Sequence, residues 1–479
     1  MTLHSARLVR VRLALVALPL LAVIGVWATG HAMAMTQWAG RAGADRGLTV
    51  AYTATFLLFA WQALLFLLDR PAKTTHRQQS NLDALRVLVA VPTFDEPYEA
   101  VQSTVTALLN QSRLPDVIYV VDDGSRNVDY APLLPWFMHA CHHAGVIPRW
   151  QRTDNGGKRH AQATALRETV DEHHIDIVWT VDSDARPDQH CLAEGLKPFA
   201  DPDMQTVTSI ILSENTRGGW LTRMMDLVMV TAQLTDRAAM SVAGAVLVNS
   251  GASAFYRIGV ILDNMDVYLN ETFFGRQMKI SDDSMLTLFG AIQGRTVQQP
   301  TSLVFTTMPH TLRGHWKQNL RWNRGSFIRS WWRMKYLPTN RFAYWWHLLR
   351  WAGFAINTVA LIYVFAVAPA VGGATARVYA ELAVWCATVQ VTFGCAVSLR
   401  YFAIRRSDQS GLYQLGTWLM TPLAILWAGS VLRANRWWAI ATCTNMGWQT
   451  RTDTTTAEPE RPAGWMPADE NETRILQLR

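Results

Sequence analysis

The sequence predicts an α/β domain with a mostly parallel sheet, inserted between membrane segments. Between residues 82 and 312, short apolar stretches rich in β-branched residues alternate with helical patterns, as expected when helices join parallel strands. Outside that region the apolar residues gather into stretches that are each about long enough to cross a bilayer. These predicted spans are 11–29, 50–69, 347–371 and 378–402.

Positive charges beside the predicted spans indicate that the α/β domain is cytoplasmic. Arg7 precedes the first span, Arg70 follows the second and Arg405 follows the fourth, each with further cations nearby. Because cytoplasmic flanks are enriched in Lys and Arg, all three places are expected inside. An alternative for residues 1–34 is a signal peptide, since HAMAM (31–35) offers a cleavage site, and cleavage leaves the later topology unchanged. The expected location is therefore the plasma membrane, with several crossings.

Three predicted strands end in acidic residues. VLVAVP (87–92) runs into TFDEP, VIYVVDDGS (117–125) ends in two acids and a Gly turn, and DIVWTVDSD (176–184) repeats the arrangement. A helix is predicted over 97–112. Its apolar face consists of Val101, Val105, Leu108 and Leu109. Parallel strands joined in this way bring their carboxyl ends, and hence these acids, to one edge of the sheet.

Asp182 and Asp184 are candidates for binding a divalent cation. They follow the predicted buried strand 177–181 at the point where it reaches the surface. Carboxylates in that place can share a cation with a substrate phosphate. A solvated turn is the alternative for a single D-x-D pair, but three acidic strand ends at one edge favour the metal site.

The segment NGGKRHAQATAL (155–166) has the composition of a phosphate-binding turn. Two glycines precede Lys158 and Arg159, and a helix-forming stretch follows. Glycine lets the backbone approach a ligand closely, and a helix N-terminus beside cations suits a phosphate. A solvated basic loop is the alternative, and the neighbouring acids favour the phosphate site.

Residues 313–350 contain nine Lys or Arg and no Asp or Glu, interleaved with six Trp. Such a stretch is typical of a helix in the membrane interface. Nucleic-acid binding is another interpretation of this composition, but the flanking spans argue against it. The five cysteines form no C-x-x-C pair, so we expect reduced packing residues and neither a zinc site nor a disulfide framework.

The motifs PTFDE, VVDDGS, NGGKRHA, VDSDA, SDDSMLT (281–287) and QNLRW (318–322) occur in a characteristic order. Over about residues 85–335 the chain resembles the membrane-embedded processive family 2 glycosyltransferases, which include the hyaluronan, cellulose and chitin synthases. The resemblance implies a Rossmann-like GT-A-type cytoplasmic domain that uses a UDP-sugar donor and Mg²⁺ or Mn²⁺. It also implies a growing glycan as acceptor, contact with the lipid bilayer and no nucleic acid.

The resemblance implies roles for individual residues. Asp283 matches the catalytic base, with Asp282 as the neighbour that caps the helix, and Asp184 is the more direct metal ligand of the D-x-D pair. The implied catalytic residues are Asp283, Gln318, Arg321 and Trp322; the nucleotide-binding residues are Thr93, Asp95, Glu96, Asp122, Lys158, Arg159, Asp182 and Arg451; and the metal ligands are Asp182 and Asp184. NSGASAFYR (249–257) stands where hyaluronan synthases carry an acceptor-side motif but differs in the middle, which leaves the acceptor open.

The C-terminal segment 411–432 is long enough to cross a bilayer, but Pro422 interrupts it and cations follow. A fifth crossing would place residues 445–451 outside. We therefore expect a re-entrant or interfacial segment, or equally a hairpin of two short spans. The sequence WQTR then stays inside and resembles the W-G-T-R element that hyaluronan and chitin synthases place over the nucleotide, so Arg451 is expected to help clamp the diphosphate.

These features predict an inverting, processive glycosyltransferase that makes a polysaccharide and passes it through its own spans. Sugar transfer requires a neutralised diphosphate leaving group and a carboxylate that deprotonates the acceptor hydroxyl. Glycosidases need no phosphate site, so the glycine-lysine turn argues against hydrolysis. A non-processive oligosaccharide or glycolipid transferase and a catalytically silent membrane scaffold are the alternatives. The expected organisation is 1–80, two transmembrane helices; 81–312, the GT-A domain; 313–346, interfacial helices with QxxRW; 347–451, transmembrane and re-entrant or interfacial segments; and 452–479, a disordered tail.

Overall fold

The computed structural model describes residues 4–9, 61–362 except Ala63, 366–367, Ala370, 387–388 and 390–445. The predicted features that lie outside the described residues are the span 11–29, the WQTR element with Arg451, and the tail 452–479. Of the predicted spans 50–69, 347–371 and 378–402, only parts are described.

The described residues form an eight-stranded mixed sheet with the strand order β4-β3-β2-β5-β8-β7-β11-β6. Its strands are β2 (Val87–Thr93), β3 (Val117–Asp122), β4 (Ile147–Arg152), β5 (Ile177–Val181), β6 (Ala185–Pro187), β7 (Met204–Ser213), β8 (Ser253–Arg257) and β11 (Arg295–Thr306). β2 pairs in parallel with both β3 and β5, so the three predicted acidic strand ends lie side by side as expected. The sheet is less parallel than predicted, because β8 returns between β5 and β7 and is antiparallel to both.

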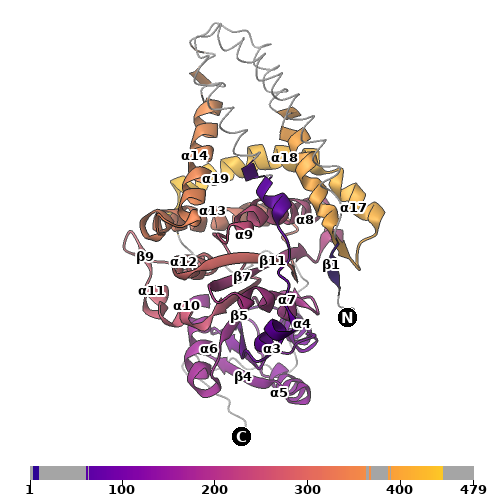
Figure 1. Ribbon diagram of the computed structural model, residues 1–479, viewed down its shortest axis with the longest axis vertical. Helices are drawn as coiled ribbons and strands as arrows, with labels where there is room; N and C mark the ends of the chain where they lie inside the picture. The colour runs from indigo at the N-terminus through magenta and orange to yellow at the C-terminus, as the bar shows by residue number, and fades with distance from the viewer. Residues whose placement is uncertain are drawn as a thin grey trace.

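Helices cover both faces of the sheet (Figure 1). One face packs against α4 (Tyr98–Leu109), α5 (Leu133–Ala144) and α7 (Cys191–Leu196). The other packs against α6 (Lys158–His173), α10 (Ile258–Leu262), α11 (Met265–Leu269) and α12 (Asp282–Gln293). Alternate residues of β2 divide between the two cores: Val89 joins the first and Leu88 the second. Burial on both faces explains why these strands are almost continuously apolar in sequence.

The C-terminal helices lie across the upper side of this sheet domain in Figure 1, with α14 rising from it. The helices of this part and those linked to it are α8 (Trp220–Ala232), η3 (Gln233–Arg237), α9 (Ala238–Val242), α13 (Leu312–Tyr336), α14 (Phe342–Ile362), α17 (Gly411–Trp418), α18 (Thr421–Trp427), η6 (Ala428–Leu432) and α19 (Arg433–Ala441). Shorter or peripheral elements are β1 (Ala6–Leu8), α3 (His76–Asp83), η1 (Lys197–Ala200), η2 (Thr216–Gly218), β9 (Thr272–Phe273), β10 (Arg276–Gln277), η5 (Leu399–Ala403) and β12 (Ile404–Arg406).

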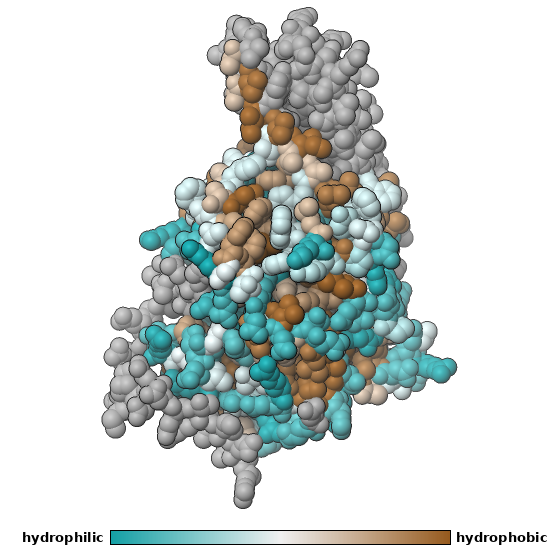
Figure 2. Space-filling model, turned by 90° about the vertical axis from the view of Figure 1, so that its left-hand side faces the viewer, coloured by the Kyte–Doolittle hydropathy of each residue, from teal (hydrophilic) through white to brown (hydrophobic). Residues whose placement is uncertain are grey.

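Within the part of the chain that the structure describes, no single helix is both long and apolar enough to cross a bilayer. Two successive helical stretches, Gly411–Trp418 and Thr421–Ala441, meet the length and composition criteria together, with a bend of 42° between them. The bend comes just before Pro422, which lies in the first turn of α18, where proline is tolerated. Many of the large apolar side chains that stay exposed belong to α13, α14 and α17–α19. On the face in Figure 2, apolar residues gather toward the upper part, and in the lower body hydrophilic residues surround an apolar patch.

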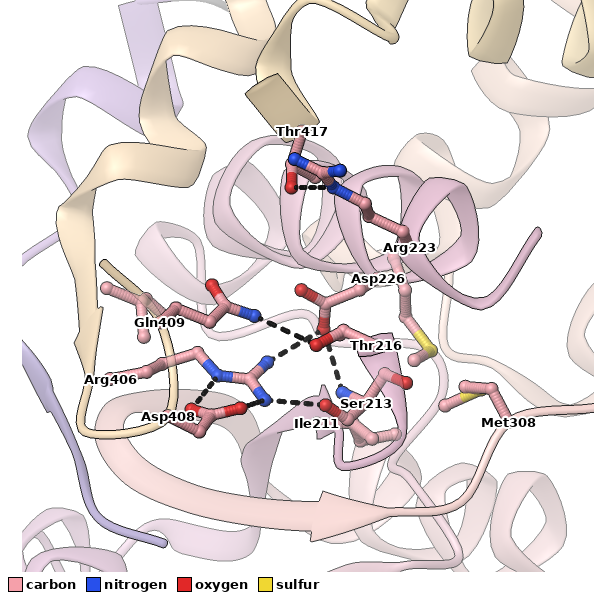
Figure 3. Close-up of polar contacts among 12 residues, drawn as sticks. Ile211, Ser213, Thr216, Arg223, Asp226, Met308, Arg406, Asp408, Gln409 and Thr417 are labelled. Carbon is pink, nitrogen blue, oxygen red and sulfur yellow. Dashed lines mark hydrogen bonds and ion pairs between the residues drawn. The ribbon is translucent and has the colours of Figure 1, made fainter. Parts of the chain in front are cut away.

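A buried ion network fastens the C-terminal segment to the sheet domain (Figure 3). Arg406, the last residue of β12, donates to Asp226 of α8 at 3.1 Å and to the carbonyl of Ser213 at the end of β7 at 2.6 Å. It also binds Asp408 at 2.7 Å, and the hydroxyl of Tyr401 donates to Asp226 at 2.7 Å. The side chains of Arg406 and Asp226 are 1% and 0% exposed. β1 also pairs with β12, so residues 6–8 and 404–406 lie side by side at this place.

Candidate active site

A cavity of about 1590 Å³ opens at the carboxyl edge of β2, β3 and β5 and extends between the sheet domain and the C-terminal helices. One part, which we call the acidic end, is lined by Glu96, Asp123, Asp182, Asp184, Asp282 and Asp283 together with Lys158. Another part, which we call the basic arm, is lined by Arg237, Arg333, Arg350 and Arg436 together with Asp236. Gln318, Arg321 and Trp322 also line this cavity, so the catalytic residues implied by the sequence border one space.

Lys158 joins two of the carboxylate-bearing elements. It is the first residue of α6, and Gly157 before it has a φ of +89°, in a region that favours glycine. Its Nζ lies 2.7 Å from Oδ1 of Asp182 and 3.1 Å from Oδ2 of Asp282. Although burial alone lowers it, these two carboxylates hold the pKa of Lys158 well above its usual value. The lysine is therefore a permanent positive charge between the end of β5 and the start of α12.

Gly251 marks the point where the charged groups converge. A Cβ atom at this position would lie 3.2 Å from Lys158 Nζ, 3.4 Å from Asp182 Oδ2 and 3.7 Å from Asp283 Oδ2. The absence of a side chain leaves these atoms facing a common space. The glycine of the predicted acceptor-side motif thus lies beside both the D-x-D pair and the implied base.

Asp282 and Asp283 begin α12 and differ in their surroundings. Burial and the neighbouring charge of Asp282 raise the pKa of Asp283 to about 6. Burial also raises the pKa of Asp282, but Lys158 and Arg159 lower it further, and the net pKa is below the ordinary value. The expectation that Asp282 caps the helix needs correction, because its carboxylate binds Lys158. Asp283 instead accepts a hydrogen bond from the backbone N–H of Ser284 at 2.6 Å.

Besides Lys158 and Asp182, two more of the nucleotide-binding residues implied by the sequence line the cavity, whereas Asp95 and Asp122 are not in the described lining. Thr93 and Glu96 line it, and the buried hydroxyl of Thr93 has no hydrogen-bond partner among the described residues. Asp122 accepts from the backbone N–H of Ser125 at 2.9 Å and is not part of the described lining. Asp95, in the loop after β2, accepts a hydrogen bond from the backbone N–H of Arg126, in the loop after β3, at 2.8 Å.

Asp123 lines the acidic end and was not singled out from the sequence. Its two carboxylate oxygens accept hydrogen bonds from the backbone N–H groups of Gly156 and Gly157, at 2.9 and 2.8 Å. It thereby sets the turn that places Lys158. Successive side chains of an extended chain point to opposite sides, so a residue one position after Asp122 faces the other way. That alternation is the signal that could have distinguished the two acids.

Arg159 points away from the cavity, in contrast to Lys158 beside it. Its side chain is 6% exposed and forms an ion pair with Glu271 at 2.8 Å. Its guanidinium also donates to the carbonyl of Tyr268 at 2.9 Å. A contact of Arg159 with nucleotide stays a prediction, as does one of Arg451, which lies outside the described residues.

The QxxRW residues are carried by α13. The side-chain carbonyl oxygen of Gln318 is buried and has no hydrogen-bond partner within the described ranges, which suits a ligand contact. Trp322 is 47% exposed and offers an aromatic face to the cavity. A Cβ on Gly325 would lie 2.8 Å from the Cβ of Ser281, so α13 packs closely against the residue before α12.

The basic arm was not foreseen from the sequence, because its arginines come from η3, α13, α14 and α19. Arg237 donates to Gln233 of its own helix at 3.3 Å, and burial lowers its pKa to about 10. The guanidinium of Arg436 lies 4.3 Å from the ring centre of Phe354. Arg350 pairs with Asp236, the carboxylate among the described residues of the arm. The arm therefore carries an excess of positive charge next to aromatic surface.

The residues present suit a divalent cation only if a ligand supplies further oxygens. Among the described residues there is no group of three or more His, Cys, Asp or Glu side chains arranged to hold a metal. Asp182 and Asp184 provide two carboxylates at the end of β5. Mg²⁺ is commonly held by one or two carboxylates together with substrate phosphates. The donor set thus fits a cation shared with a phosphate group.

Comparison with known proteins identifies relatives of this arrangement. Residues 85–325, about half of the chain, match the family described as glycosyltransferase like family 2. A hyaluronan synthase of Streptococcus pyogenes is 33% identical over 280 residues, which cover 58% of this chain and 65% of the synthase. An N-acetylglucosaminyltransferase of Rhizobium meliloti (strain 1021) is 29% identical over 286 residues, which cover 58% of this chain and 63% of the relative. The alignment thus spans less than two thirds of either relative.

A solved structure shares the fold. The mannosyltransferase from Pyrobaculum calidifontis in complex with GDP-Man and Mn²⁺ has a TM-score of 0.52 and 20% sequence identity, over 81% of this chain and 97% of that chain. At this identity the likeness concerns the fold alone. It supports the GT-A-like interpretation of the mixed sheet.

Proposed function

Since the chain belongs to glycosyltransferase like family 2 and is a glycosyltransferase, we propose that it is an inverting, processive enzyme similar to hyaluronan synthase. In this proposal it transfers sugar from a UDP-sugar to a growing polysaccharide and passes the product across the membrane. The observation that carries the proposal is the continuity of the cavity, in which the acidic end, the QxxRW residues and the basic arm border one space. A donor at one end and a long acceptor in the rest would occupy such a space.

The acidic end supplies the groups that the transfer needs. Asp283 takes the proton of the acceptor hydroxyl as its oxygen forms a bond to the anomeric carbon, and the bond from that carbon to the diphosphate breaks. The electron pair leaves with the UDP, whose charge Lys158 and Arg321 offset. Displacement by one base on the face opposite the leaving group inverts the anomeric centre.

Asp182 and Asp184 would hold the Mg²⁺ or Mn²⁺, with Asp184 as the more direct ligand. When bound, the cation neutralises charge on the diphosphate. Lys158 lies on Asp182 in this structure, so its pairing has to adjust when a cation and a diphosphate share that carboxylate. In this proposal the nucleotide contacts Thr93 and Asp123, which line the cavity at the ends of β2 and β3.

The basic arm suits a glycan that carries carboxylates. Four arginines face one carboxylate there, and the rings of Trp351 and Phe354 lie within the same lining. Arginine binds carboxylates in a fixed bidentate geometry, and aromatic faces pack against sugar rings. A polymer that contains a uronic acid, as hyaluronan does, has both kinds of surface.

The proposal also assigns segments of the chain to the lipid bilayer. We place α13 in the membrane interface and the partly described apolar stretches, with the 411–441 region, within the membrane. The pairing of β1 with β12 supports the inferred topology, because the charge rule puts residues 6–8 and 404–406 on the same side.

The test is to give the purified chain Mn²⁺ and a panel of UDP-sugars, singly and in pairs, and to measure UDP release and product size. We expect a donor or a pair of donors to yield a high-mass polymer. Products of one or a few sugars would contradict processivity and favour a non-processive transferase. Polymer formed from one donor alone would remove the hyaluronan-like assignment while leaving a processive synthase.

A further inference from the structure

Glu271 lies behind the acidic end and is buried between two arginines. Arg329 of α13 donates to its two carboxylate oxygens, at 2.7 and 3.0 Å, and Arg159 of α6 pairs with it at 2.8 Å. The exposed fractions of the Glu271, Arg329 and Arg159 side chains are 3%, 0% and 6%. Together the two arginines hold the pKa of Glu271 below its usual value despite its burial, so the carboxylate is ionised. We call these three residues the Glu271 cluster.

The Glu271 cluster also holds the backbone at the entrance to α12. Arg159 donates to the carbonyl of Ile280 at 3.1 Å, and Arg329 donates to the carbonyl of Ser281 at 3.2 Å. Both carbonyls belong to the two residues that directly precede the helix. The cluster therefore connects α6 and α13 to the turn from which Asp282 and Asp283 project.

That turn has an unusual backbone. Ser281 has a φ of +63°, a left-handed conformation that residues other than glycine rarely adopt, and its side chain makes no capping hydrogen bond. Such a conformation persists when the surroundings determine it. Here the surroundings are Arg329 on the carbonyl and Gly325, which lets α13 approach Ser281 closely.

A buried ion cluster is a poor means of stabilising a fold in general. The cost of removing charges from water offsets their attraction, and apolar residues of similar volume often serve as well. What such a cluster can do is favour one arrangement over others, because each charged group needs its partner. The arrangement favoured at Glu271 is the turn at 280–281.

We propose that Glu271, with Arg159 and Arg329, is a positioning residue that directs Asp283 toward the acceptor and Asp282 toward Lys158. It acts through the backbone of the turn and touches neither donor nor acceptor. The inference rests on the proposed function, since it assigns the cluster to the transfer step.

The variants are Glu271→Gln and Arg329→Lys in the full-length chain. Glu271→Gln keeps the size of the side chain and removes its charge. Arg329→Lys keeps the charge but cannot donate in the same fork to the carboxylate and the Ser281 carbonyl. Asp226→Asn is the matched control, because it removes the charge from another buried carboxylate, shown in Figure 3, whose partners lie in β12, η5 and β7 and not in α12.

Two measurements separate positioning from folding. The first is hydrogen exchange of a peptide covering 282–286, because the N–H of Met285 donates to the Ser281 carbonyl at 3.2 Å and reports on the held turn. The second is UDP release, with kcat, KM for the donor and UDP affinity determined separately. We expect both Glu271 cluster variants to exchange at least tenfold faster at 282–286 and to lose at least tenfold in kcat, with UDP affinity within about threefold of the parent.

Asp226→Asn should leave exchange at 282–286 unchanged and should alter exchange in α8 instead. The proposal is overturned if folded Glu271→Gln or Arg329→Lys keeps kcat within threefold of the parent, if exchange at 282–286 does not change, or if Asp226→Asn gives the same pattern. If Glu271→Gln does not fold, Arg329→Lys decides by the same criteria. A parent chain that releases UDP from no donor would overturn the proposed function alone, and the exchange comparison would still decide whether the cluster holds the turn.

Discussion

The acidic end and the basic arm belong to one cavity but are built differently. At the acidic end, Asp182 after β5 and Asp282 of α12 both bind Lys158, so these three charges are paired specifically. In the basic arm, arginines from four separate elements share the single described carboxylate of Asp236. Groups that already form ion pairs must exchange partners when a ligand binds. Several unshared positive charges instead attract an anionic ligand through their total charge. Single substitutions should therefore have large and distinct effects at the acidic end and small, graded effects in the arm.

The largest expected effect is that of Asp283→Asn. Loss of a general base costs roughly 10²- to 10⁴-fold in rate, and the amide keeps the size of the side chain. We expect UDP release to fall by that range while UDP binding in the presence of Mn²⁺ stays at the parent level. Asp282→Asn is the comparison, because it removes the ion pair to Lys158 but keeps the base, and it should remain partly active. An inactive Asp282→Asn beside a fully active Asp283→Asn would reverse the assignment.

The next effect concerns metal-dependent binding. Asp184→Asn removes the more direct of the two carboxylates proposed to hold the cation. UDP affinity in Mn²⁺ should fall about tenfold or more, toward the affinity that the parent shows with a chelator. Calorimetric titration of both proteins with UDP, with and without Mn²⁺, measures this. If the folded variant binds UDP as tightly as the parent does, Asp182 and Asp184 form a turn and not a metal site.

The pH dependence of the parent chain tests the environment of Asp283. Because burial and Asp282 raise the pKa of Asp283 to about 6, the carboxyl group is protonated and inactive as a base below that pH. We expect kcat/KM to fall roughly tenfold per pH unit on the acid side of about pH 6 and to level off above it. Initial rates of UDP release over that range, with a check that the protein stays folded, provide the profile. An acid limb centred near pH 4 would show that the carboxyl group has an ordinary pKa.

The smallest expected effect lies in the basic arm. Arg237→Gln removes one of four positive charges, and the remaining three still attract an anionic chain. We expect product length to fall roughly threefold, with a smaller fall in the initial rate. Gel filtration of the polymer made by parent and variant measures the length. Arg149→Gln, which breaks a surface ion pair with Glu172, serves as the control. Equal polymer lengths from the parent, Arg237→Gln and Arg149→Gln would show that the basic arm does not bind the growing product.

The strand ends could be predicted because their signal is local. β-Branched runs that end in Asp or Gly identify β2, β3 and β5 from a few residues each, and family resemblance adds the order of the motifs. The direction in which a single side chain points is harder to predict from the sequence. Asp122 and Asp123 are neighbours of the same type, and so are the cations Lys158 and Arg159, yet in each pair one residue lines the cavity and the other is not in its described lining.

Contacts between distant segments could not be predicted. Glu271 and Arg329 are 58 positions apart, and neither stands in a motif that was singled out. The arginines of the basic arm meet only after α13, α14 and α19 have packed against η3. These residues meet their partners only in the folded chain, so no periodicity or short motif in the sequence identifies them.

Asp226 and Arg406 are 180 positions apart, and this separation has a consequence for synthesis of the chain. At ribosomal rates of roughly 5–20 residues per second, Asp226 leaves the ribosome on the order of 10 to 40 s before its partner exists. A carboxylate without its partner resists burial, so the surface around α8 should stay hydrated during that interval. The sheet domain would then pack against the C-terminal helices only after these helices have been synthesised. The cavity between them would therefore form last.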